Sequence, residues 1–238
     1  MGCCVNKGAD HGMSFDRGSY LAEELCREEK IIIENEKQLQ FTQIQSKEII
    51  RSIKSEGLDN TLSLAQLKRA FIDINIPESA FTTPDAPLRN LLAKVTNDKK
   101  LYEQRKLVLV GILLGKGTPQ EKCEWLFRQY DDDASSMMDQ NEVNLMLNDL
   151  IDVAVNVLPN VSKGDGIGFL TKDELDAYRD TLLSGKEKFI EEMIKLIMTE
   201  REIMHVELAA KMADTSNILN KLLWSFGIRT LLKKHSTH

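Results

Sequence analysis

The stretch YDDDASSMMDQNEV, residues 130–143, places acidic and hydroxyl side chains between two apolar segments. We count it as a twelve-residue loop that begins at Asp131. Side-chain oxygens then fall at the first, third, fifth, ninth and twelfth positions, and a backbone carbonyl falls at the seventh. Oxygen ligands at alternate residues can surround a hard cation. The loop therefore predicts a Ca²⁺ site whose ligands are Asp131, Asp133, Ser135, the carbonyl of Met137, Asp139 and Glu142.

Apolar residues on both sides of this loop recur with helical spacing. One face precedes the loop and another follows it, formed by Cys123, Leu126, Phe127 and Tyr130 and by Val143, Met146, Leu147 and Leu150. A helix, an oxygen-rich loop and a second helix in this phase resemble an EF-hand. The sequence departs from that motif at Ser136, because the motif has a glycine there with positive φ. We expect this serine to lower calcium affinity without abolishing binding.

The pattern of the helix that follows the loop recurs four times in the chain. The residues at the loop-closing position are 40, 36 and 32 residues apart, and they are Gln66, Lys106, Glu142 and Glu174. This regularity predicts an all-α fold with four EF-hand units in two pairs and long helical extensions at both ends. The other three loops lack most acidic ligands, so only residues 131–142 are expected to bind calcium.

These repeats divide the chain into five parts. Residues 1–18 are expected to be a flexible, acylatable N-terminus, and residues 19–45 an N-terminal helix. The helical pattern runs from Ser19 to Glu56, as one long helix or as two helices with a bend near residues 43–46. A degenerate EF-hand pair is predicted over 46–115, and a second pair over 116–184 with its intact loop at 131–142. Helical stretches over 186–213 and from Asp214 onward are predicted to form the C-terminal part, 185–238. The last helix could be ordinary core, a plug in a groove, or a surface for a partner.

The N-terminus, MGCCVNK, carries residues that can be lipidated. After removal of Met1, Gly2 can accept myristate, and Cys3 and Cys4 can accept palmitate. Two such signals are needed for stable membrane attachment. Asn6 departs from the usual myristoylation pattern, which has serine or threonine at that position, and an unmodified tail is the alternative.

Composition excludes several classes of function. The net charge of −6 and the absence of a dense Lys/Arg block argue against nucleic-acid binding. No glycine-rich phosphate loop is present, and the four histidines lie outside any recognisable catalytic arrangement, so we expect neither an enzyme nor a small-molecule substrate. The longest apolar run, residues 107–114, is too short to span a bilayer.

Acylatable residues ahead of four helix-loop-helix units are similar to the neuronal-calcium-sensor, calcineurin-B and flagellar calcium-binding families. The resemblance implies a calcium-binding, membrane-associated regulator or adaptor without catalytic activity. Such a protein would lie at the cytoplasmic face of a membrane, plasma or ciliary/flagellar, or otherwise in the cytoplasm or cytoskeleton. It would bind a protein partner through a hydrophobic groove or its terminal helices. The alternative is a structural subunit of a cytoskeletal or ciliary complex with little calcium dependence.

Overall fold

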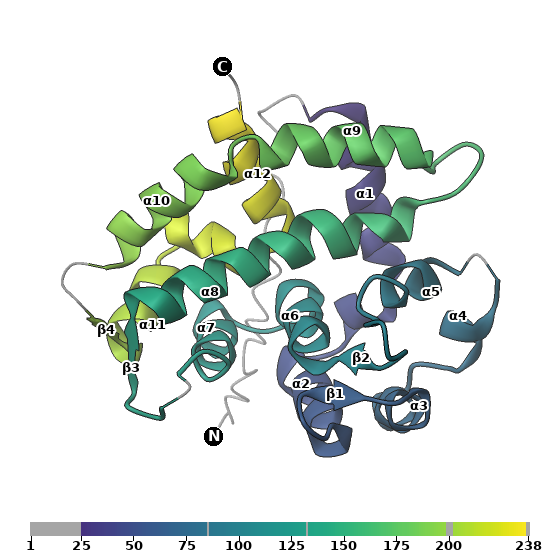
Figure 1. The fold of residues 1–238 in the computed structure, drawn as a ribbon, viewed down its shortest axis with the longest axis horizontal. Coiled ribbons are helices and arrows are strands. Elements are labelled where there is room, and N and C mark those ends of the chain that lie inside the picture. The colour runs from purple at the N-terminus through teal and green to yellow at the C-terminus, as the bar shows by residue number, and fades with distance from the viewer. Residues whose placement is uncertain (1–24, 85, 132, 199–201, 237–238) are drawn as a thin grey trace, which may run out of the picture.

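The computed structural model describes residues 25–84, 86–131, 133–198 and 202–236. This part of the chain is mostly helical, with two short antiparallel β-ribbons (Figure 1). The all-α expectation is confirmed at this coarse level. Of the described helices, none is long and apolar enough to cross a membrane.

The first half of the chain is organised around one of the two ribbons. Leu62 of β1 lies opposite Tyr102 of β2, and Thr61 lies opposite Glu103. Its elements are α1 (Arg27–Gln38), η2 (Gln40–Gln43), α2 (Ser46–Glu56), β1 (Thr61–Leu62), α3 (Leu64–Asp73), α4 (Ser79–Thr82), α5 (Pro87–Leu92), β2 (Tyr102–Glu103) and α6 (Gln104–Leu114).

The second half contains the other ribbon, and α8 with its continuation crosses the width of the molecule (Figure 1). The continuation is a π-helical segment, η3, followed by a 3-10 segment, η4, that contains Pro159. The elements are α7 (Pro119–Phe127), β3 (Met137–Asp139), α8 (Gln140–Ile151), η3 (Asp152–Val157), η4 (Leu158–Ser162), α9 (Lys172–Leu183), α10 (Lys186–Ile197), β4 (Glu202–Met204), α11 (His205–Ala213), η5 (Ile218–Leu223) and α12 (Ser225–Ser236).

Two of the predicted helices are interrupted. In the region 19–45, α1 ends where Leu39 takes an extended conformation, and a 3-10 turn follows before α2. The helix predicted over 186–213 is wrong in its middle, because β4 separates α10 from α11. Both segments have apolar residues on a helical period, which does not reveal where a helix stops unless a glycine or proline marks the place.

Helix starts in the predicted repeats are fixed by local hydrogen bonds. A serine, threonine or aspartate caps four of the helices, and the residue three positions later returns a bond to the cap residue's backbone N–H. These capping boxes are Ser63–Gln66, Thr118–Glu121, Asp139–Glu142 and Thr171–Glu174. In three of these four boxes, the residue that returns the bond is also a predicted loop-closing residue: Gln66, Glu142 and Glu174.

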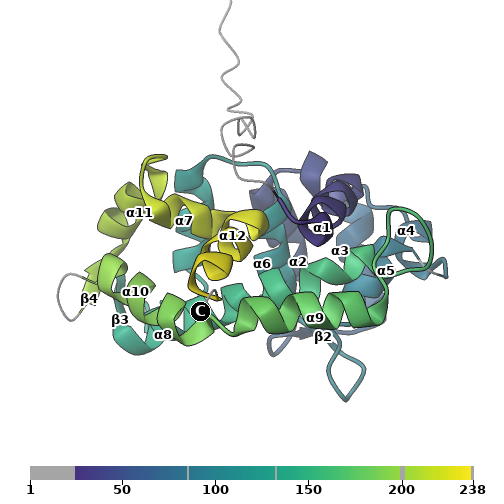
Figure 2. The same cartoon turned by 90° about the horizontal axis from the view of Figure 1, so that it is seen from above.

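The terminal helices do not extend away from the fold. The side chains of Ile228, Leu231 and Leu232 of α12 are buried in the common core. Figure 2 shows α12 lying among the other helices, above α9. Gly227 lies against η5, where a Cβ atom would come within 2.2 Å of the carbonyl oxygen of Lys221. Of the three possibilities for the last helix, the structure favours a packed element over a free one.

A buried ion-pair network joins the two terminal helices. Arg229 of α12 is fully buried, and its guanidinium nitrogens lie 2.8 Å from a carboxylate oxygen of Glu29 and 2.8 Å from one of Glu36, both on α1. Tyr178 also donates a hydrogen bond to Glu29, and Ser225 donates one to Glu36 at 2.9 Å. Burial alone would lower the pKa of Arg229, but the two carboxylates hold this pKa well above its ordinary value. Arg229 is therefore a charged residue on which both ends of the described fold depend.

Replacing Arg229 with alanine should lower the free energy of unfolding by about 3 to 5 kcal/mol, because it leaves two buried carboxylates without their counterion. Arg27→Ala is the matched control, since Arg27 pairs with Glu174 at the surface. It should change the same free energy far less than Arg229→Ala does, because solvent screens an exposed ion pair. Urea denaturation followed by circular dichroism measures both, and equal effects would contradict a central role for Arg229.

Candidate metal-binding site

The loop between α7 and α8 contains a tight turn centred on Ser136. Ser136 has φ of 63° and Ala134 has φ of 55°, so both lie in the left-handed region that serine and alanine rarely adopt. The backbone N–H of Ser136 donates to the Asp131 carboxylate at 3.2 Å. The turn thus folds the sixth residue of the loop back onto the first, as the sequence requires for a closed cation site.

Ser135 brings several predicted ligands together. Its hydroxyl donates to the carbonyl oxygen of Met137 at 3.0 Å and lies 3.5 Å from a carboxylate oxygen of Asp131. Its backbone N–H donates to Asp133 at 3.0 Å. Hydrogen bonds from Ser135 lower the pKa of Asp133, which favours the ionised form. Oxygens of four of the six predicted positions therefore gather in one turn.

The two remaining acids, Asp139 and Glu142, form the capping box of α8. Glu142 accepts a hydrogen bond from the backbone N–H of Asp139 at 2.9 Å, and Asp139 accepts one from the N–H of Glu142 at 2.8 Å. These bonds satisfy amides at the start of α8, which otherwise lack partners. Across the described residues, which omit Asp132, no three His, Cys, Asp or Glu side chains lie close enough together to hold a metal ion. The donor chemistry fits Ca²⁺, whereas the predicted shell is only partly assembled.

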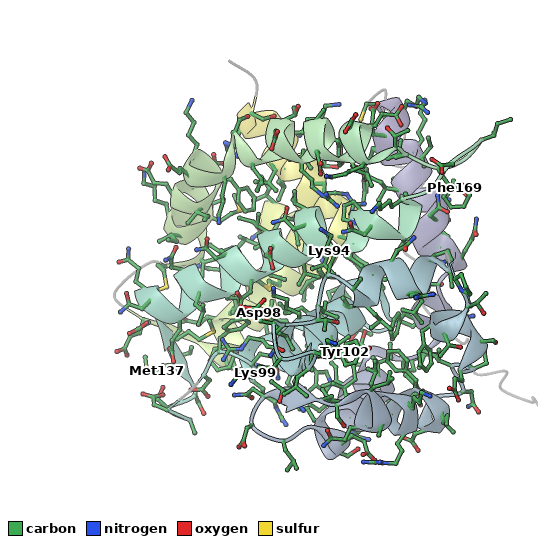
Figure 3. All side chains as sticks on the ribbon, turned by 45° about the vertical axis from the view of Figure 1, so that its right-hand side comes forward. Lys94, Asp98, Lys99, Tyr102, Met137 and Phe169 are labelled. Atoms are coloured by element: carbon green, nitrogen blue, oxygen red, sulfur yellow. The ribbon has the colours of Figure 1, made fainter. Side chains whose placement is uncertain are left out.

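The loop pairs with a different segment from the one expected. Met138 of β3 lies opposite Ile203 of β4, and Met137 lies opposite Met204. The pairing of this loop with residues 163–174, predicted as the second half of the 116–184 pair, is therefore wrong. Figure 3 shows Met137 and Phe169 at opposite sides of the molecule.

The chain between β3 and residues 163–174 explains why these two segments do not pair. The π-helical and 3-10 turns of η3 and η4 extend the path of α8 away from β3. The loop that follows closes on itself through a bridge between Lys163 and Leu170. A sequence signal for the correct partner exists: Glu207 follows Ile203 by four residues, just as Glu142 follows Met138.

A shared backbone feature marks all four predicted loops. Each has a residue with positive φ six positions before its loop-closing residue. These residues are Asn60 at 59°, Lys100 at 60°, Ser136 at 63° and Gly168 at 87°. A left-handed residue at this one position is thus common to the four segments, although they share little sequence.

The predicted lipidation residues Gly2, Cys3 and Cys4 lie outside the described residues, as does the first part of the predicted 19–45 helix. Comparison with known proteins adds no assignment. No family model matches the chain, and neither the curated proteins nor the solved structures include a significant match.

The ribbon pairing predicts a specific cross-link. Met137 and Met204 are directly opposite, and the neighbouring pair Ser136–His205 carries the backbone hydrogen bond. Opposite residues without such a bond have the closest Cβ atoms, about 4.5 Å apart, which is the upper end of the disulfide range. In a chain whose native cysteines are replaced by serine, Met137→Cys with Met204→Cys should form a disulfide under mild oxidation. Met137→Cys with Phe169→Cys should not, and mass mapping distinguishes them. Efficient cross-linking of the second pair would contradict the observed register.

Glu174 gives a prediction about pH. The backbone N–H of Thr171 and the Arg27 side chain hold its pKa at about 2, below the ordinary value of a glutamate. The folded-state pKa is depressed, so its stabilising contribution is present above the unfolded-state pKa of about 4.3 and is lost as pH falls toward 2. The difference in unfolding midpoint between wild type and Glu174→Gln should therefore shrink between pH 5 and pH 2. A constant difference over this range would contradict the assignment.

Proposed function

We propose that this chain is a calcium-binding regulatory or adaptor protein of the EF-hand type, with residues 131–142 as its working loop. The observation that carries the proposal is the gathering of oxygens from Asp131, Asp133, Ser135 and Met137 in one turn closed by left-handed Ser136. Alternating oxygens of this kind suit Ca²⁺, which accepts six to eight oxygen ligands. The left-handed residue common to the four segments and the two β-ribbons support the EF-hand assignment.

Asp139 and Glu142 would complete the set of ligands. One Glu142 oxygen accepts the backbone N–H of Asp139 in the capping box of α8. Binding calcium with both carboxylate oxygens would therefore compete with this bond. Together with the strained Ser136, this competition predicts weaker calcium affinity than a loop that has glycine at the sixth position.

The ribbon provides a route from the loop to the C-terminal half. β3 pairs with β4, which leads directly into α11, and α11 packs against α7 and η5. A cation can shift a conformation only by binding its two states differently. A regulatory role therefore requires the β3–β4 unit to differ between the calcium-free and calcium-bound protein. In this proposal the change alters the binding of a protein partner, and acylated Gly2, Cys3 and Cys4 attach the protein to a membrane.

A second candidate is a structural subunit with little calcium dependence. The specific observation in its favour is that the α1–α12 contact is locked by buried Arg229, and Glu142 is already occupied by its capping bond. Neither candidate includes catalysis, nucleic-acid binding or a small-molecule substrate.

Calorimetric titration separates the two candidates. We expect Ca²⁺ to release or absorb heat at one site per chain, and Mg²⁺ in equal excess not to replace it. Glu142→Gln should remove the signal, since it deletes a charged ligand. Glu174→Gln, a substitution at the matching position of the expected fourth loop, should leave it unchanged. No heat at millimolar calcium, or equal loss in both variants, would favour the structural subunit.

A further inference from the structure

One face of α2 carries a row of cations. Lys47, Arg51 and Lys54 recur at spacings of four and three residues, which places them within about 60° of one another around the helix. All three side chains are exposed. Within residues 25–236 as the structure describes them, none of the three forms an ion pair with an acid. A row of unneutralised cations stands out on a chain whose net charge is −6.

Two cations that flank the neighbouring helix α7, Lys116 before it and Arg128 after it, extend this row at both ends. At one end, the backbone N–H of Ser46 donates to the carbonyl oxygen of Lys116 at 2.7 Å, which brings exposed Lys116 beside the start of α2. At the other end, Arg128 lies near Lys54: partial burial and the charge of Arg128 together lower the pKa of Lys54. α2 and α7 contact each other along this side (Figure 1). We call Lys47, Arg51, Lys54, Lys116 and Arg128 the basic face.

The acidic side chains of α7 already have partners within or next to that helix. Glu124 pairs with Arg128 at 2.5 Å, and Glu121 is held by the capping box with Thr118. Glu48 on α2 lies at the edge of the row, about 60° around the helix from Arg51 and about 100° from Lys47. Together with Arg51 it lines an open hollow of about 760 Å³ beside α2. Because the hollow is open and the three cations lie along one exposed helix face, they favour an extended surface of anionic groups as the ligand.

A membrane surface with anionic headgroups has that chemistry. Lysine and arginine on long stems can reach a plane of phosphates from a convex helical face, and each contributes to attraction near such a surface. Trp125, half-buried with Arg128 5.5 Å from its ring, adds an amphipathic residue of the kind found at membrane interfaces. We propose that the basic face binds anionic lipid headgroups. This contact goes beyond the calcium site, and it is separate from any acyl chain at Gly2, Cys3 or Cys4.

Vesicle sedimentation with the full chain, produced without acyl groups, tests the proposal. The protein should bind phosphatidylserine/phosphatidylcholine vesicles at low salt, and it should not bind phosphatidylcholine vesicles. The triple variant Lys47→Gln, Arg51→Gln, Lys54→Gln should weaken the partition coefficient roughly 100-fold, as expected for the loss of three membrane-facing charges. Circular dichroism establishes that the variant is folded.

A second triple variant, Lys94→Gln, Lys99→Gln, Lys100→Gln, is the matched control. It removes the same charge from three exposed lysines between α5 and β2. Figure 3 labels two of them, Lys94 and Lys99. It should weaken the partition coefficient less than threefold. The proposal is overturned if the wild type does not bind the anionic vesicles, or if the two triple variants reduce the partition coefficient equally. It is also overturned if a poly-glutamate peptide binds the basic face more tightly than the vesicles do, since the ligand is then an acidic protein segment.

Discussion

The described fold depends on one buried charge. Arg229 is surrounded by Glu29, Glu36 and the carbonyl oxygen of Ala154, so its guanidinium donates to partners from two other elements. Desolvating such ions is expensive, and only near-complete pairing offsets it. The network therefore specifies one arrangement of the terminal helices instead of simply adding stability. It also explains why α12 does not behave as a detachable extension.

Local features of this structure were readable from the sequence. The helix that follows the acidic loop and the left-handed residue at position 136 both follow from residue types at fixed spacings. These predictions depend only on interactions between residues within about a dozen positions of each other, and the order of residue types along the sequence indicates such interactions directly.

Distant pairings were not readable in the same way. β3 was expected to pair with a segment about 30 residues away, but β4 is about twice as far along the chain. The segment 163–174 has a glycine with positive φ and a capping box, so by local criteria it resembles a paired loop. The choice is made by where η3 and η4 carry the chain and by the burial of Ile203 against the core. For the site, the same limit applies to Glu142: its position was predicted from spacing, whereas its use as a cap depends on side-chain orientation.

The separation of β3 from β4 has a consequence for the order of folding. The β1–β2 ribbon can form once residue 103 has been synthesised, but β3 has no strand partner until residue 204 is available. The Glu29–Arg229 contact spans 200 residues and needs nearly the whole chain. Long-range contacts of this kind form late, because the entropy of closing the intervening chain opposes them first. The candidate calcium loop therefore belongs to the part of the molecule that is completed last, and a chain shortened at its C-terminus would keep the loop's residues but not its partner strand.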